Sequence, residues 1–202
     1  MLHSCMKHTE ILRDPRVIAF IILTLIAAPL LSYTIVLHIT PLSIDQQSVV
    51  SYVQSHAPFD TQDFTPEEIS HLDDVYLVML FSKVILVVSL VGIVIVSYTL
   101  RTSPILPITL RLSGIVLIVF ILLLSIFVAV AFTTVFALFH QLFFSPGTWT
   151  FPSSSALIQR FPLDFFIGIT KKILTGTLVI GALLIAASKV MNKYSKNLNN
   201  TP

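Results

Sequence analysis

The sequence predicts an all-α membrane protein: a bundle of four transmembrane helices, with two extracytoplasmic loops that form a small outer cap and with both termini cytoplasmic. Hydrophobic residues make up 55% of the 202 residues and charged residues only 11%, whereas a soluble domain carries about 25% charged residues. The hydrophobic residues gather in four long runs, and a helix of about 20 such residues spans a bilayer. We therefore expect residues 1–202 to form a single membrane domain, in which Cys5 has no disulfide partner.

The first membrane helix is expected over residues 17–37, which contain no charged residue. Pro29 interrupts this run, but neighbouring helices in a membrane protein can satisfy the backbone groups that a proline frees. Residues 38–74 form the first outer cap segment, with seven acidic residues and neither Lys nor Arg. Within it, the patterns of Ser43–Gln46 and Thr65–Glu68 fit the capping box, which predicts a helix start at each place.

The second and third membrane helices are expected to be longer than the bilayer requires. Residues 75–100 and 112–139 give runs of 26 and 28 residues, against about 20 for a span. We therefore expect the first turns of the second helix and the last turns of the third to project above the hydrocarbon. Residues 140–164 form the second outer cap segment, which is rich in the aromatic residues typical of a membrane interface. The fourth helix is expected over residues 165–187, followed by a cytoplasmic tail, 188–202.

The basic residues predict the orientation. Eight Lys and Arg residues lie in the N-terminal segment, the loop from Arg101 to Arg111 and the tail. The first outer cap segment has none, and the second has Arg160 alone. By the positive-inside rule, this is a multi-pass protein of the cell membrane whose two cap segments face the extracytoplasmic side.

Two histidines at helix ends are the candidate catalytic residues. His71 precedes the second apolar run and His140 follows the third, so we expect both at the outer face. Asp74 lies three residues after His71 on the same helix face, where a carboxylate can orient an imidazole and raise its basicity. No Gly-x-Ser-x-Gly or His-Glu-x-x-His motif is present, so a serine nucleophile has no support. Acid–base chemistry by His, or metal binding by His and Asp, remains.

The motifs around these histidines resemble a known family. They read Glu-Ile-Ser-His-Leu-Asp-Asp-Val over residues 68–75, Phe-His-Gln-Leu-Phe-Phe over residues 139–144 and Gly-Thr-Trp-Thr-Phe over residues 147–151, continued by residues 157–166. In this order and at these helix ends, they resemble the bacterial integral-membrane family of the lipoprotein intramolecular transacylase (Lit). The resemblance covers essentially the whole chain.

The resemblance implies a membrane acyltransferase that moves the sn-2 acyl chain of a diacylglyceryl-Cys lipoprotein to the α-amine of the same cysteine. It implies catalytic roles for His71 and His140. In our interpretation His71, supported by Asp74, is the base, and His140 donates the proton or stabilises the oxyanion, with the reverse assignment open. The implied substrate contacts are Trp149, Arg160 and Phe143. The expected partners are the lipid-modified lipoprotein and membrane lipids, without nucleic acid, cofactor or metal.

Two alternatives stay open on the sequence alone. One is a metal-binding membrane protein, with His71, His140, Asp74 and His38 as ligands. The other is a non-enzymatic integral membrane protein with a divergent role. Metal analysis and His→Ala variants would separate these alternatives from a transacylase, because a metal site would lose its metal and a scaffold would keep its function.

Overall fold

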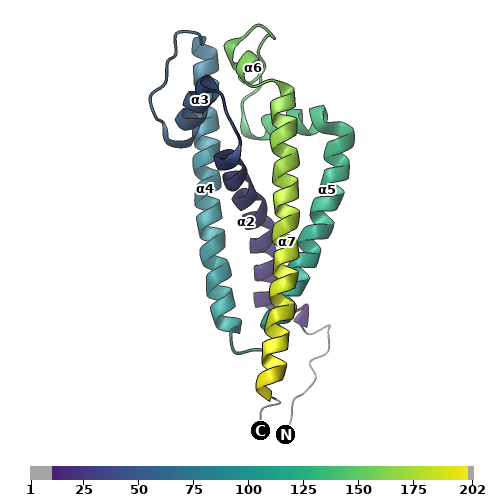
Figure 1. The fold of residues 1–202 in the computed structure, drawn as a ribbon. Coiled ribbons are helices and arrows are strands. Elements are labelled where there is room, and N and C mark those ends of the chain that lie inside the picture. Colours follow the sequence, from purple (N-terminus) through teal and green to yellow (C-terminus); the bar gives the residue numbers. More distant parts are fainter. Residues whose placement is uncertain (1–10, 200–202) are drawn as a thin grey trace. The chain divides into compact units, whose positions relative to one another are not determined.

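The structure, a computed structural model, describes residues 11–199, with side chains up to Lys193. The expectations for Cys5 and for the ends of both terminal segments lie outside this range. The described residues contain the helices labelled in Figure 1 and no β-strand. These helices are α2 (Pro15–Ile39), α3 (Ile44–Ser55), α4 (Pro66–Leu100), α5 (Ile105–Phe143), α6 (Ala156–Arg160) and α7 (Leu163–Asn199).

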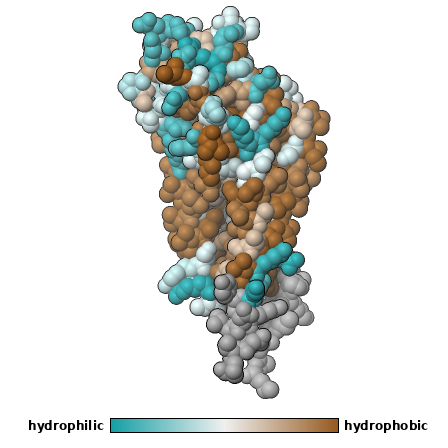
Figure 2. Space-filling view, viewed as in Figure 1, coloured by the Kyte–Doolittle hydropathy of each residue, from teal (hydrophilic) through white to brown (hydrophobic). Residues whose placement is uncertain are grey.

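Four of the described helices are long and apolar enough to cross a membrane: α2, α4, α5 and the Leu163–Lys193 part of α7. Only a minority of the residues in their apolar stretches, between 11% and 33%, are buried, and Figure 2 shows hydrophobic side chains over their surface. In a soluble protein such a surface would be an aggregation liability, whereas lipid tails solvate it. The predicted all-α class with four membrane helices is confirmed.

Several helix boundaries differ from the sequence expectation: α7 continues to Asn199, beyond the expected end at residue 187, and α5 ends at Phe143 and not at residue 139. We expected the third apolar helix to begin at Leu112, but α5 begins at Ile105. The turn after α4 therefore contains only residues 101–104. Pro107 is tolerated because it lies in the first turn of α5, where its missing N–H would have no partner within the helix.

The chain divides into two compact units, and each of the four long helices contributes residues to both. Among the described residues, the first unit comprises 11–32, 85–123 and 174–199. A hydrophobic cluster in it joins the start of α2 to the turn between α4 and α5, through Ile11, Val17, Leu100, Ile105 and Leu106.

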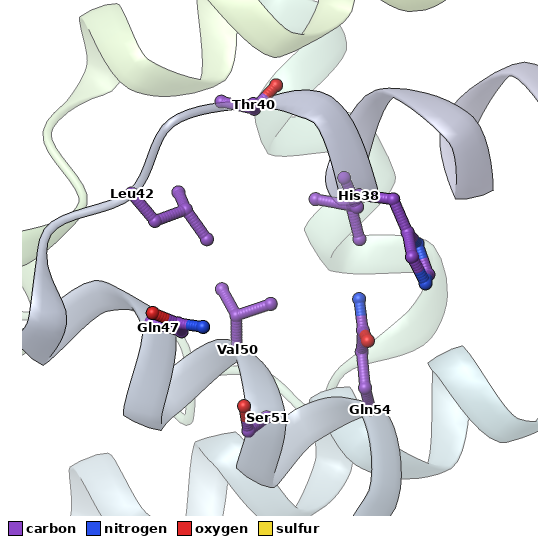
Figure 3. Close-up of a pocket in the computed structure, with 8 residues that line it drawn as sticks. His38, Thr40, Leu42, Gln47, Val50, Ser51 and Gln54 are labelled. Atoms are coloured by element: carbon purple, nitrogen blue, oxygen red, sulfur yellow. The ribbon is translucent and has the colours of Figure 1, made fainter.

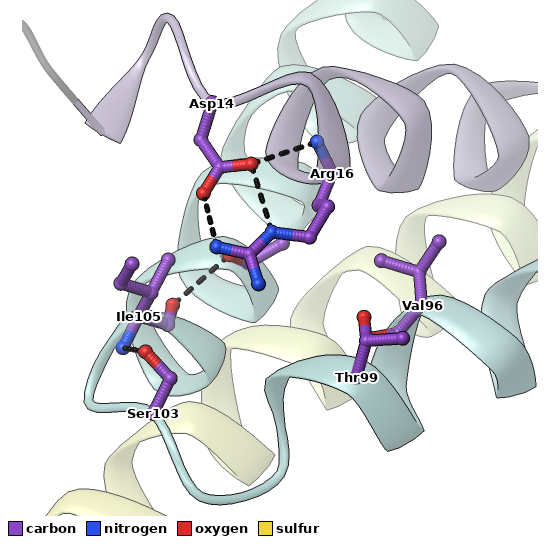
Figure 4. Close-up of polar contacts among 7 residues, drawn as sticks. Asp14, Arg16, Val96, Thr99, Ser103 and Ile105 are labelled. Carbon is purple, nitrogen blue, oxygen red and sulfur yellow. Dashed lines mark hydrogen bonds and ion pairs between the residues drawn. The ribbon is translucent and has the colours of Figure 1, made fainter.

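Polar contacts fix two helix starts in the first unit. Asp14 precedes α2 and accepts hydrogen bonds from the backbone N–H and the guanidinium of Arg16, as Figure 4 shows. The bond from the Arg16 guanidinium lowers the pKa of Asp14. Ser103 Oγ accepts from the backbone N–H of Ile105, at 3.2 Å, at the start of α5. These contacts satisfy backbone N–H groups that a helix start leaves without partners.

Glycines allow α5 and α7 to approach closely in the first unit. We predict that Gly114→Ala destabilises the protein, because the added Cβ would lie 2.6 Å from the carbonyl oxygen of Gly181. A backbone carbonyl cannot yield without a shift of α7, so the expected cost is about 1–3 kcal/mol. Thermal unfolding of the purified protein in detergent measures this loss. Gly168→Ala is the matched control, since its Cβ would meet no atom within 4 Å; an equal loss of Tm in both variants would contradict the prediction.

The second unit comprises residues 33–84 and 124–173. Hydrophilic side chains gather over its α3 and α6 region in Figure 2. Beneath them, a hydrophobic cluster links these two short helices to the start of α4. Its buried members are Val49, Tyr52, Val53, Phe64, Leu72, Leu157 and Phe161.

Both capping boxes predicted from the sequence are present in the second unit. At α3, Ser43 Oγ accepts from the Gln46 N–H at 3.2 Å, and Gln46 Oε1 accepts from the Ser43 N–H at 3.0 Å. At α4, Thr65 Oγ1 accepts from the Glu68 N–H at 3.2 Å, and Glu68 Oε2 accepts from the Thr65 N–H at 2.8 Å. Helix α4 therefore begins at Pro66 and carries His71 in its second turn.

Candidate functional site

The two histidines at the helix ends come together in the second unit. His71 lies in the second turn of α4, and His140 lies in the last turn of α5. Their rings are stacked, with centroids 6.2 Å apart and planes inclined by 24°. Within α5, Ala131 has non-helical backbone angles (φ −136°, ψ 40°). The helix is kinked at Ala131, so the turns after this residue, which carry His140, run at an angle to the turns before it.

His71 is buried among aromatic rings. Its side chain is 6% exposed, and its ring lies 4.8 Å from that of Phe144 and 5.6 Å from that of Phe151. Its Nδ1 is buried and has no hydrogen-bond partner within the described part of the chain. Because a buried polar atom without a partner costs about 1–3 kcal/mol, such an atom calls for an explanation. A bound molecule with a polar group could supply the missing hydrogen bond.

His140 is oriented by its own helix. Its Nδ1 lies 2.7 Å from the backbone carbonyl oxygen of Phe136, one turn earlier. A carbonyl oxygen can only accept, so this contact assigns the proton of the neutral ring to Nδ1 and leaves a lone pair on Nε2. The Phe136 ring packs at 4.1 Å and the Trp149 ring at 5.0 Å from that of His140. These contacts therefore fix the orientation of the His140 imidazole, and its Nε2 can accept a proton.

The predicted supporting carboxylate, Asp74, is half-buried one turn after His71. No hydrogen bond joins Asp74 to His71 among residues 11–199. Its neighbour Asp73 instead accepts a hydrogen bond from the Tyr52 hydroxyl of α3. Burial, together with this bond, raises the pKa of Tyr52 to about 12. The hydrogen bond between Asp73 and Tyr52 thus connects α4 to α3.

The three predicted substrate contacts lie in different surroundings. Trp149 is beside His140 and lines a cavity of about 260 Å³ together with Gln141, Phe144, Pro146 and Gly147. Phe143 is half-exposed and packs on Phe139, with ring centroids 4.8 Å apart. Arg160 is paired with Asp63 at 2.6 Å and lies 4.6 Å above the Phe64 ring. Of the three, only Trp149 is in ring contact with a histidine.

The surroundings of Arg160 predict a structural contribution rather than a substrate contact. We expect Arg160→Ala and Asp63→Ala to lower stability by the same small amount, about 0.2–1 kcal/mol, because the ion pair is partly exposed. Thermal unfolding of both single variants and of the double variant provides the measurement. Equal and non-additive effects are expected. A rise in KM with Arg160→Ala alone would instead indicate a direct contact with the substrate.

Glu68 is a residue of the site that sequence reasoning assigned only to the capping box. It is 1% exposed, and its Oε1 accepts from the backbone N–H of Leu157 at 2.8 Å, 89 residues away. This N–H lies in the first turn of α6, where a negative charge is favourable. The local pattern predicted the bond to Thr65, but the bond to Leu157 had no signal because it depends on the tertiary fold. Glu68 thus fastens the second outer cap segment to the helix that carries His71.

The metal site that the sequence left open would need several ligand side chains close together. Among residues 11–199, no group of three or more His, Cys, Asp or Glu side chains is gathered in a way that could hold a metal ion. His38, one of the four ligands considered above, lies at the end of α2, where its Nδ1 is 3.0 Å from the Thr34 carbonyl oxygen.

The sequence of this chain matches a known family. The family model described as "Lipoprotein intramolecular transacylase Lit" matches residues 17–166. The match includes His71, His140, Trp149 and Arg160, and it extends over more than half of the chain. No curated protein sequence matches the chain.

Solved structures share the fold. The in meso structure of the membrane integral lipoprotein intramolecular transacylase Lit from Bacillus cereus gives a TM-score of 0.79 at 17% identity, covering 90% of this chain and 96% of that chain. Two variants of that protein, with a histidine replaced by arginine or by alanine, each give a TM-score of 0.76 at 17% identity. They cover 90% of this chain and 92% and 94% of theirs.

Proposed function

Because the chain belongs to the lipoprotein intramolecular transacylase (Lit) family, and so is a membrane acyltransferase, we propose that it converts diacylglyceryl lipoproteins to the lyso form. The sn-2 acyl chain moves from the glycerol oxygen to the α-amine of the N-terminal cysteine of the same lipoprotein. The observation that carries this proposal is the pair of stacked imidazoles, contributed by two different helices and enclosed by aromatic rings.

The reaction balances without any further reactant. The amine nitrogen attacks the ester carbonyl carbon, a C–N bond forms and the C–O bond to glycerol breaks. One proton leaves the amine and one proton reaches the glycerol oxygen. Donor and acceptor belong to one molecule, so the chain of atoms from the amine to the acyl carbon closes an eight-membered ring in the tetrahedral intermediate. The main task of the enzyme is therefore to hold the substrate in this folded geometry.

His140 is the proposed base. Its Nδ1–H is directed to the Phe136 carbonyl oxygen, so the Nε2 lone pair is the group that can accept the proton of the attacking amine. The carbonyl then also stabilises the imidazolium that forms. Return of the same proton to the glycerol oxygen restores the enzyme. This is the reverse of the role assignment favoured by the sequence, and the difference follows from the partner of each ring.

His71 is the proposed stabiliser of the oxyanion. It has no hydrogen bond to Asp74, and its buried ring carries one N–H in the neutral form. A buried donor directed at developing negative charge is worth more than the same donor in water. The carbonyl oxygen of the scissile ester is the group on which this charge develops.

The aromatic rings around the histidines keep the reaction intramolecular. Water competes with the amine for the ester, and hydrolysis would release a fatty acid. Phe144 and Phe151 cover His71, and Trp149 covers His140. We propose that these rings exclude water, and that the positive-inside distribution of Lys and Arg orients the site toward the extracytoplasmic side.

Expression in a bacterium that makes diacylglyceryl lipoproteins tests the proposal. Mass spectrometry of the N-terminal peptide of a lipoprotein is expected to show a lyso-glyceryl group and an N-acylated cysteine, at unchanged total mass. A diacylglyceryl cysteine with a free amine would refute the proposed function for that lipoprotein. A lyso-lipoprotein with a free amine would indicate a hydrolase.

A further inference from the structure

A second cavity, with a largely polar lining, lies within the second unit and is lined by neither His71 nor His140. It has a volume of about 260 Å³ and lies between the end of α2 and helix α3. Its polar lining residues are His38, Thr40, Gln47, Ser51 and Gln54, and the others are aliphatic. Figure 3 shows the side chains of Val50 and Gln54 extending from α3 toward the segment that carries Thr40 and Leu42. The proposed chemistry uses none of these residues.

Two lysines from other helices donate hydrogen bonds to residues that line this cavity, although neither lysine lines it. Lys172 of α7 donates from Nζ to the Thr40 hydroxyl at 3.2 Å. Lys83 of α4 donates to the backbone carbonyl of Gln54. An ammonium group has three donors, so each lysine keeps two for a ligand. No residue that lines the cavity is acidic, and two of the lining residues, Thr40 and Gln54, accept hydrogen bonds from lysines.

The size and level of the cavity favour a small polar group of a lipid. Pockets for drug-sized ligands have volumes of about 300–1,000 Å³, so a cavity of about 260 Å³ fits a smaller group. It begins at Leu37, where the apolar run of α2 ends. Lysines within apolar helices extend their ammonium groups to the level of the lipid headgroups. Phosphate is the anion that a membrane supplies at that level.

We propose that the cavity between α2 and α3 binds the phosphate of a membrane phospholipid headgroup, with Lys83 and Lys172 as its cationic partners. The amide groups of Gln47 and Gln54 add neutral donors. The acyl chains of this lipid extend along the exposed apolar surface of the helices. Such a lipid would hold α3 against the ends of α2, α4 and α7. The site is independent of the transacylase reaction.

Lipid titrations of the full-length protein in neutral detergent, followed by native mass spectrometry, test this site. The probes are phosphatidylglycerol and a diglucosyl diacylglycerol with the same chains. Phosphatidylglycerol is expected to form its first adduct about tenfold more tightly, because only it offers a charged hydrogen-bond acceptor. Lys83→Ala/Lys172→Ala is expected to abolish this preference, and Lys83→Arg/Lys172→Arg to retain it.

A second variant separates the cavity from the charge. Ser51→Leu leaves both lysines in place and fills the cavity, so it is expected to lose the preference as well. It also keeps the test decisive if the double alanine variant fails to fold. Equal binding of the two lipids by the unmodified protein, or unchanged preference in Ser51→Leu, would overturn the proposal. Displacement of the adduct by inorganic phosphate at equal concentration would also overturn it, in favour of a free-anion site.

Discussion

Replacing His140 with alanine is expected to lower the rate of acyl transfer by about 10²–10⁴-fold, the usual contribution of a general base. The Nε2 lone pair that we propose as the acceptor of the amine proton would be lost, together with the contact between Nδ1 and the Phe136 carbonyl oxygen. Single-turnover conversion of a diacylglyceryl lipopeptide in detergent, followed by mass spectrometry, measures the rate. The fold should survive, because His140 is half-buried at a helix end.

Glutamine variants separate the proposed roles of the two histidines. His71→Ala removes the proposed oxyanion donor and is expected to slow acyl transfer by about 10²–10³-fold. His71→Gln restores an N–H donor, so it should recover part of this loss. His140→Gln supplies no base and should be as slow as His140→Ala. Recovery by His140→Gln and none by His71→Gln would reverse the assignment.

A histidine outside the site provides the matched control. His56 ends α3 in the left-handed conformation, with φ 57° and ψ 30°. Its ring packs on Tyr52 and Tyr76, not on either site histidine. His56→Asn keeps a residue that tolerates this backbone conformation. Its rate should equal that of the unmodified enzyme; a loss as large as that of His140→Ala would attribute the effect to a general disturbance of the unit.

Local patterns in the sequence predicted what depends on neighbouring residues. Four apolar runs predicted the four membrane helices, since a run of that length and composition has few alternatives to a spanning helix. The capping boxes at Ser43 and Thr65 were predicted because both partners of each bond lie within four residues. The positions of His71 and His140 at helix ends follow from the lengths of the same runs.

Contacts between distant segments could not be predicted from these patterns. Asp74 has the helical spacing to support His71, yet it is Asp73 that is bonded, because α3 presents Tyr52 to it. Arg160 is basic and lies in an aromatic loop, yet Asp63, 97 residues earlier, pairs with it. The kink at Ala131 is not caused by a proline, so the sequence contained no signal for it. For Asp73 and Arg160, the partner is supplied by a segment whose position only the tertiary fold determines.

Replacing Glu68 is the second change with a large expected effect. Glu68→Ala removes the acceptor of two backbone N–H groups, those of Thr65 and Leu157. The Leu157 bond is buried, and leaving that N–H without a partner is expected to cost about 1–3 kcal/mol. The Tm of the purified protein should fall accordingly. Acyl transfer should also slow, since Phe151, which packs on His71, belongs to the segment that this bond holds.

The neighbouring glutamate makes this prediction specific. Glu67 has the same charge and the same helix turn but is exposed, so Glu67→Ala should change neither Tm nor rate. Glu68→Gln keeps the shape and one acceptor oxygen, and it should lie between Glu68→Ala and the unmodified enzyme in both measurements. If Glu68 acts only by position, its variants should keep the pH profile of the remaining activity. A shifted profile would show instead that the carboxylate takes part in the proton transfer, and this would require a revision of the roles proposed for the two histidines.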